Sequence, residues 1–125
     1  MATTRGVRVQ VEAEYLPGES VPENNYYFFS YHVTITNQGE ETVQLLNRHW
    51  IITNADGKKE EVRGAGVIGQ QPLLHPGESF HYSSFCPLAT PVGTMQGSYE
   101  MAAEGGGRFD AAIAPFTLAM PGMLQ

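Results

Sequence analysis

The stretch Tyr26-Tyr27-Phe28-Phe29-Ser30-Tyr31-His32-Val33-Thr34-Ile35-Thr36 alternates between two kinds of side chain. One set is large and apolar: Phe29, Tyr31, Val33 and Ile35. The other set is mostly polar: Phe28, Ser30, His32 and Thr34. Successive side chains of a β-strand point to opposite faces, so this stretch predicts a strand with one buried face. No segment shows an amphipathic helical period of useful length, and the alternation therefore decides the fold class.

Similar segments occur on both sides of this strand and are separated by turn residues. They predict strands over residues 7–15, 26–36, 43–53 and 59–63, then from residue 79, over 95–101 and from 108 to 118. Seven short strands at this spacing are typical of an all-β, immunoglobulin-like or fibronectin type III-like β-sandwich of about seven antiparallel strands. A small β-barrel fits the same pattern.

Local breaks in the pattern predict where the strands turn or bulge. Asp56-Gly57 is a hairpin signal, because glycine supplies the positive φ that the turn needs. The apolar phase changes near Leu46–Asn47, which predicts a β-bulge. Pro115 interrupts the last strand and predicts an edge position or a bulge. Residues 64–78 are expected to form one long loop.

Length and charge limit the classes of protein that the chain can represent. The 125 residues predict a single domain over residues 1–125. The net charge is −6, with 13 acidic and 7 basic side chains, and no basic run occurs. A protein that binds nucleic acid by neutralising phosphates needs a basic face, so no nucleic-acid partner is expected.

Three further features predict a cytoplasmic protein. Cys86 is the only cysteine, so no intrachain disulfide can form, as is usual in a reducing compartment. The N-terminus lacks the apolar stretch of a signal peptide. No window approaches the roughly 18 apolar residues of a transmembrane helix, so no membrane insertion is expected.

The string Gly64-Ala65-Gly66-Val67-Ile68-Gly69 matches the dinucleotide-binding pattern GxGxxG. That site needs a helix directly after the glycines, and Pro72 and Pro76 interrupt any helix here. A simpler interpretation is a loop that needs positive φ or close backbone approach. A third is an anion site, in which loop amides act together with Arg48 and Arg63 on a phosphate or a partner's carboxylate. The arginines can equally pair with acidic residues of this chain.

Other chemistry-bearing residues give weaker signals. His32 and His81 are expected side by side on an exposed face if their strands are neighbours, but no zinc-like spacing occurs, and neither a metal site nor a cofactor is predicted. No nucleophile is followed by a base and an orienting group, so no catalytic residues are assigned and an enzyme is not expected. Trp50 is interpreted as a core anchor rather than an exposed hot spot.

The chain resembles the ApaG family (the DUF525 domain) over nearly its whole length. The resemblance lies in Val7-Arg8-Val9 with Tyr15, in residues 26–37, in 45–50, in 61–72, in Pro76-Gly77-Glu78, in Gly97-Ser98-Tyr99, and in Phe109, Ile113, Pro115 and Phe116. It implies a single ApaG domain with a fibronectin type III-like sandwich fold. The family is linked to cobalt tolerance and magnesium efflux, and related domains occur in F-box proteins and in a protein that interacts with a DNA polymerase.

Two functions from different classes therefore remain open. The first is a non-enzymatic protein-interaction module that acts in divalent-cation homeostasis, with a protein partner of unknown identity. The alternative is a small-anion binder for pyrophosphate or a nucleotide, which uses the Gly64–Gly69 loop. The candidate binding residues for either function are Arg48, Arg63, Gly64, Gly66 and Gly69. A homodimer through an edge strand is a further expectation.

Overall fold

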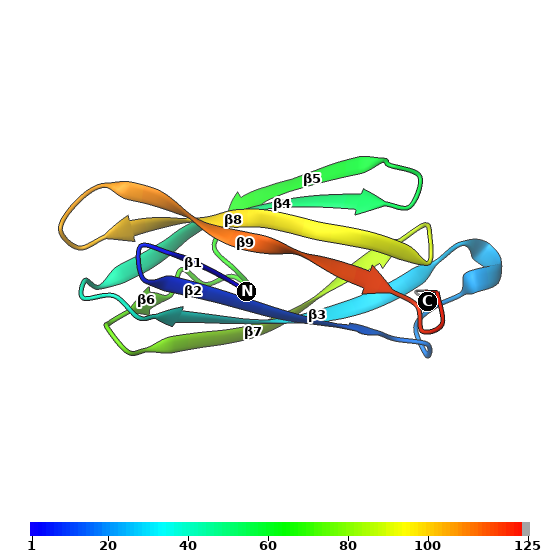
Figure 1. The fold of residues 1–125 in the computed structure, drawn as a ribbon, viewed down its shortest axis with the longest axis horizontal. Coiled ribbons are helices and arrows are strands. Elements are labelled where there is room, and N and C mark those ends of the chain that lie inside the picture. The colour runs from blue at the N-terminus through cyan, green and yellow to red at the C-terminus, as the bar shows by residue number, and fades with distance from the viewer. Residues whose placement is uncertain (124–125) are drawn as a thin grey trace.

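The computed structural model describes residues 1–123, which form two antiparallel β-sheets packed face to face (Figure 1). One sheet has the order β1-β2-β3-β7, with bounds Ala2–Thr4, Val7–Tyr15, Tyr27–Asn37 and Ser79–Leu88. The other has the order β5-β4-β8-β9, with bounds Lys59–Ala65, Val43–Asn54, Val92–Ala103 and Arg108–Ala119. A short β6 (Leu73–Leu74) pairs with β4, and a 3₁₀ turn, η1, spans Pro22–Asn24. The predicted all-β sandwich is confirmed.

The large apolar side chains of β3 face the interior, as predicted. Phe29, Tyr31, Val33 and Ile35 are all buried between the sheets. The register with β2 sets Val9 opposite Ile35, and both side chains lie in the core. A one-residue slip would send the whole apolar set to the solvent face, so burial fixes this register.

Trp50 anchors the second sheet to the first. Its side chain is 2% exposed, which confirms the interpretation as a core residue. The indole contacts Tyr31, Tyr99 and Phe116, with ring centroids 5.3, 6.1 and 5.9 Å away and near-perpendicular or edge-on geometry. Such aromatic pairs contribute about 0.5–1.5 kcal/mol each beyond the area they bury.

The structure extends several predicted strands and confirms the predicted bulges. β7 continues through Pro87 to Leu88, whereas a connection was expected from residue 87. An edge strand tolerates this proline, since one side of it forms no ladder. The expected loop over 64–78 contains the end of β5 and all of β6. The β4–β8 register shifts between Leu45 and Asn47, and Pro115 lies on the edge strand β9 next to a second shift.

The sandwich is closed along one side and open along the other. On the closed side β9 packs against β1 and β2, and the Ala112 amide donates to Thr4 Oγ1 over 3.1 Å. On the other side β5 and β7 are the edge strands of their sheets, and no strand pairing joins them within residues 1–123. The two layers therefore diverge at β5 and β7.

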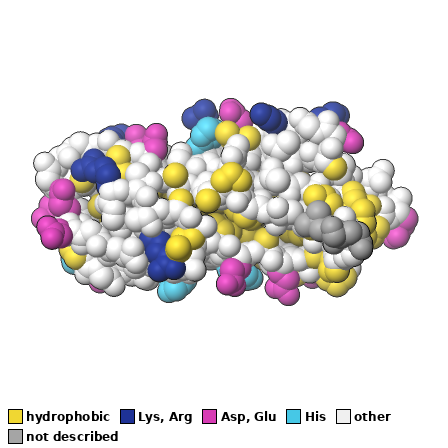
Figure 2. All heavy atoms as spheres, in the orientation of Figure 1, with side chains coloured by type: hydrophobic (Ala, Val, Ile, Leu, Met, Phe, Trp, Pro, Cys, Tyr) yellow, Lys and Arg dark blue, Asp and Glu magenta, His cyan; other side chains and the backbone are white. Residues whose placement is uncertain are grey.

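Figure 2 shows the molecule in the orientation of Figure 1, with apolar side chains along the seam between the layers. On this face Lys and Arg side chains occur singly, with Asp and Glu between them, and form no broad basic surface. Within the described residues, no helix has the length and apolar character needed to cross a bilayer.

The close approach of β8 to β4 predicts that replacing Gly97 strongly destabilises the protein. A Cβ at Gly97 would lie 1.9 Å from the His49 carbonyl oxygen, which is backbone and cannot move aside. Gly97→Ala is therefore expected to lower the free energy of unfolding by about 3 kcal/mol or more in urea denaturation. Gly18→Ala is the control, because nothing lies within 4 Å of a Cβ there. Equal effects of the two substitutions would contradict this packing.

Candidate functional site

Arg48 lies on the inner face of β4, near the open side of the sandwich. It shares this face with Trp50 and pairs in register with Gly64 on β5. Its Nη1 donates to the carbonyl oxygens of Ala65 and Gly66, over 3.1 and 3.0 Å. The guanidinium lies directly over Gly64, where a Cβ would be 2.7 Å from Nη2. Gly64 is therefore needed for this position of Arg48.

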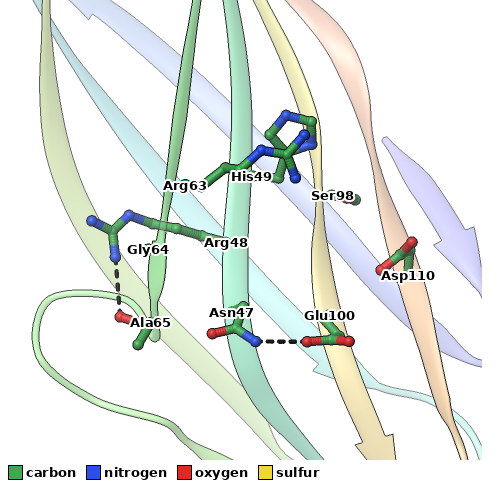
Figure 3. Close-up of a pocket in the computed structure, with 9 residues that line it drawn as sticks. All are labelled: Asn47, Arg48, His49, Arg63, Gly64, Ala65, Ser98, Glu100 and Asp110. Carbon is green, nitrogen blue, oxygen red and sulfur yellow. Dashed lines mark hydrogen bonds between the residues drawn. The ribbon is translucent and has the colours of Figure 1, made fainter.

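Arg63 lies on the opposite face of the same sheet. It pairs in register with His49, and the two side chains point toward each other on the outer surface (Figure 3). Arg63 Nη2 lies 3.9 Å from Glu61 Oε2, and His49 Nε2 lies 3.6 Å from Glu61 Oε1. Arg48 is on the other face of β4 from His49, because neighbouring residues of a strand alternate between its faces. Both arginines nevertheless line one pocket on the outer face, so their joint action on one anion stays a prediction.

The outer face carries a shallow pocket of about 480 Å³. Its lining includes Arg63, His49, Ser98, Glu100 and Asp110 (Figure 3). Most of its charge is matched within the chain: Glu100 accepts from Asn47 Nδ2 over 2.6 Å and lies 3.8 Å from Arg108 Nη1. A pocket whose charges already have partners offers a ligand little electrostatic gain.

The glycine loop forms a tight hairpin and no helix follows it. Val67 and Gln70 exchange two backbone hydrogen bonds of 2.8 and 2.9 Å. The two residues between them have positive φ, +43° at Ile68 and +77° at Gly69, as in a type I′ turn. Gly66 also has positive φ, and a Cβ there would strike the Gln70 carbonyl oxygen at 2.2 Å. The expectation of positive φ and close approach is confirmed at Gly66.

The hydrogen bonds of the loop limit its use as an anion site. The amides of Gly66, Val67 and Gln70 already donate to backbone carbonyls of this chain. The carbonyls of Ala65 and Gly66, rather than amides, face the Arg48 guanidinium. An anion cradle requires successive amides that point outward. Anion binding by the Gly64–Gly69 loop stays a prediction, with few donors to support it.

Ile68 is strained and exposed at the tip of this hairpin. Its φ of +43° is unusual for a β-branched side chain, and 56% of its surface is accessible. Strain of this kind costs about 1–3 kcal/mol and tends to persist where function requires it. Ile68 lines the pocket that also contains Arg48, so the strained residue lies beside the half-buried cation.

A groove runs along the open side of the sandwich between β5 and β7. It consists of two adjoining pockets of about 240 and 230 Å³, which share Tyr31, Arg48 and Ser84. The first continues under the hairpin and is also lined by Val67, Ile68, Gly69 and Tyr82. The second continues toward the other end of β5 and is also lined by Trp50, Ile52, Glu60, Val62, Phe85, Cys86, Pro87 and Met95. We call these two pockets together the side groove.

Tyrosine hydroxyls lie beneath Arg48 in the side groove. Tyr82 and Tyr99 share a short buried hydrogen bond between their hydroxyl groups. Burial raises the pKa of Tyr99, Tyr82 and Tyr31 above the usual tyrosine value, and the positive charge of Arg48 lowers each of them in part. Ser84 lines the same pocket as Tyr31 and lowers the pKa of Tyr31 in part. The inner end of the groove is therefore polar but uncharged apart from Arg48.

Arg48 differs from Arg63 and Arg108 in having no acidic partner. Within residues 1–123, no carboxylate lies within 4.0 Å of its guanidinium. The carboxylate that lines the same groove is Glu60, on the inner face of β5. An Arg with no acid and spare donors is a site for carboxylate or phosphate recognition.

The histidines and the cysteine lie away from the polar end of the groove. His32 and His81 are on the outer face of β3 and β7, two positions apart in register, and each bonds a hydroxyl across the strands. No group of three or more His, Cys, Asp and Glu is placed to hold a metal in the part of the chain described. Burial raises the pKa of the Cys86 thiol to about 11, which disfavours the reactive thiolate.

Sequence reasoning identified Arg48 but missed the residues around it. Tyr31 was placed on the buried face as an apolar side chain, and its hydroxyl was not considered. Ser84 and Glu60 gave no signal, because their role depends on β7 and β5 lying opposite each other. Ile68 did carry one: a β-branched residue directly before Gly69 is unusual for the tip of a tight hairpin.

These features define a small antiparallel β-sandwich with one closed side and one grooved side, a fold that commonly presents binding surfaces. A family model described as the ApaG domain (DUF525) matches residues 17–103. Protein ApaG of Aromatoleum aromaticum is 58% identical over the whole of both chains. Protein ApaG of Pseudomonas entomophila is 58% identical over 95% of this chain and 94% of its own.

Solved structures agree with these matches. The crystal structure of the putative ApaA protein from Bordetella pertussis has a TM-score of 0.91 and 49% identity, and it covers 97% of this chain and 98% of its own. A second structure, an X-ray structure from a structural genomics consortium, has a TM-score of 0.90 and 48% identity over 96% of this chain and 91% of its own. The chain belongs to the ApaG family.

The buried hydroxyls predict a loss of stability in alkali. Tyrosines of the unfolded chain ionise near pH 10, whereas Tyr82 and Tyr99 hold their protons in the folded state. The folded protein then binds more protons, so the free energy of unfolding should fall above about pH 10, by up to ~1.4 kcal/mol per pH unit for each group. Urea denaturation between pH 8 and 11 measures this fall. Phenolate absorbance from all 6 tyrosines in the still-folded protein would contradict it.

The strained hairpin tip predicts that one substitution stabilises the protein. Ile68→Asn places a residue that favours a type I′ turn at this position and is expected to raise the free energy of unfolding by about 1 kcal/mol. Ile68→Val, which stays β-branched, is the control and should give no gain. Thermal and urea denaturation compare the two. A loss of stability in Ile68→Asn would show that the side chain contributes packing instead of strain.

Proposed function

We propose that this chain is a non-enzymatic protein-interaction module that receives an extended segment of a protein partner in the side groove. The observation that carries the proposal is the edge strand β7, which borders the groove and contains no Lys, Arg, Asp or Glu from Ser79 to Leu88. Natural edge strands are usually protected from pairing by charge, by proline, by a bulge or by a covering segment. The proline of β7, Pro87, is next to the end of the strand and leaves Ser79 to Cys86 without proline or charge. An uncharged edge of ten residues is suited to accept another strand.

Apolar side chains near β7 support the same function. Phe85 is 59% exposed and its ring stacks on Phe28, with centroids 5.5 Å apart. Phe28 stacks in turn on Tyr26, at 5.8 Å, to give an aromatic row on the outer surface. Aromatic residues, phenylalanine included, are enriched in protein–protein interfaces. A partner strand added to β7 would lie next to this row.

Ile68 gives the groove an apolar cover at its other end. The side chain is exposed in the free protein and held at positive φ by the hairpin. A bound segment would bury it and recover part of its transfer free energy, up to about 1.5–3 kcal/mol for a residue of this size. This burial accounts for an isoleucine at a position where asparagine or glycine is the relaxed choice.

The cellular role follows from the family resemblance rather than from the groove. The resemblance links such chains to cobalt tolerance and magnesium efflux, and we place the proposed interaction in divalent-cation homeostasis. In this role the protein acts through its partner, and direct metal binding is not required. The small-anion alternative has no comparable support, since loop amides donate within the chain. A homodimer stays a prediction, with β7 as the edge it would use.

The two arginines provide a matched test of this function. Affinity capture from native lysate should recover a specific protein with the natural chain and with Arg63→Ala, and lose it with Arg48→Ala. Both arginines line the outer pocket, but of the two only Arg48 also lines the side groove. Circular dichroism confirms that both variants fold. In a strain that lacks the natural protein, Arg63→Ala should restore cobalt tolerance and Arg48→Ala should not. Capture that depends on Arg63 and is indifferent to Arg48 would contradict the proposal.

A further inference from the structure

The side groove carries two opposite charges at fixed positions. Arg48 on β4 is opposite Gly64, and Glu60 lies four residues from Gly64 on β5. Both side chains are on the inner face, because residues 60, 62 and 64 pair with residues 52, 50 and 48, and Trp50 and Val62 face the interior. Both line the groove, and no ion pair joins them in the described part of the chain. A bound segment therefore meets a cation where the two pockets join and an anion in the second pocket.

The separation of these charges matches the repeat of an extended chain. Four residues of a strand span about 13 Å, and side chains four positions apart point to the same face. A segment added to the edge of β7 would project every second side chain across the groove toward β5. Two side chains four positions apart on that segment would have the same spacing along the groove as Arg48 and Glu60, so one could contact each.

We propose that the side groove selects an extended segment with an acidic residue and a basic residue four positions apart, the acidic one against Arg48 and the basic one against Glu60. This inference rests on the proposed function, since it names the chemistry of the segment that the groove receives. Arg48 has spare guanidinium donors, because the bonds to Ala65 and Gly66 are made by Nη1. The carboxylate of the segment would accept from these donors beside the hydroxyls of Ser84 and Tyr31.

A second copy of this chain does not satisfy the same groove. In a pair formed through β7 of two copies, the inserted strand would be Ser79–Leu88, which has no Asp, Glu, Lys or Arg. Arg48 and Glu60 would then be covered without partners, and desolvating a charge without a partner is costly. The charge pattern therefore favours a segment from a different chain over self-association.

Selection from a random library of displayed ten-residue peptides tests the inference on the purified full chain. Enriched peptides are synthesised, and their binding is mapped by amide chemical shifts and measured by titration. We expect peptides that shift the β7 and hairpin amides to carry an acidic and a basic residue four positions apart. Exchanging those two residues within a peptide should weaken binding about tenfold, as expected for two surface ion pairs replaced by repulsion.

Variants of β5 supply the control. Glu60 is exposed, so Glu60→Lys should leave the fold and Arg48 unchanged. The groove then carries two positive charges, and the selection should shift toward peptides with acidic residues at both positions. Glu61 is adjacent to Glu60 on β5 but lies on the outer face of the sheet. Glu61→Lys makes the same change of charge there and should leave the selection unchanged.

The outcomes separate this inference from the proposed function. Peptides that bind at β7 without an acidic and a basic residue four positions apart would overturn the inference and leave the proposed function intact. Peptides with a pattern that Glu60→Lys does not change would do the same. Peptides that bind only elsewhere would overturn both. Shifts at β7 that depend on protein concentration without peptide would identify a second copy as the occupant and overturn the inference alone.

Discussion

A guanidinium on the inner face of the second sheet is the constraint on which the rest of the structure depends. Arg48 follows the same strand face as Trp50, but a guanidinium stays charged in proteins and cannot be sealed between sheets without a counter-charge. Its Nη1 is bound by two carbonyls of the glycine hairpin, while no carboxylate of residues 1–123 neutralises it. The sandwich can close along β2 and β9 but not along β5 and β7, where this charge lies.

Several distant features follow from that constraint. The absence of a side chain at Gly64 lets the guanidinium lie over it, and the hairpin after it turns a carbonyl toward Arg48. The buried hydroxyls of Tyr82 and Tyr99 satisfy each other below the charge. β7 is left as an uncharged edge beside a groove, with a strained isoleucine at one end and Glu60 toward the other. Together these contacts support the proposed binding role of the side groove.

The fold could be predicted from the sequence because each strand has one apolar face. The alternation of Phe29 to Ile35, the phase change at Leu46 and the proline at 115 act locally and predicted the strands, the bulge and the edge strand. The site was predictable only in part. Arg48 and Arg63 could be chosen as candidates from the sequence. Their placement on opposite faces of the sheet could not be predicted without the register between β4 and β5. The side groove could not be predicted without knowing how the two sheets pack. Ser84 and Glu60 are far apart in the chain and line the same groove only because β7 and β5 lie opposite each other.

In the proposed function a partner strand adds to β7 along the open side. Amide hydrogen exchange tests it most directly, measured residue by residue on the free protein and on the protein saturated with a groove-binding peptide. The account predicts that binding slows exchange at alternate residues of Ser79–Leu88, because one edge of a strand gains hydrogen bonds. Unchanged exchange along β7, with slowing at Arg63 and Ser98 on the outer face instead, would contradict it.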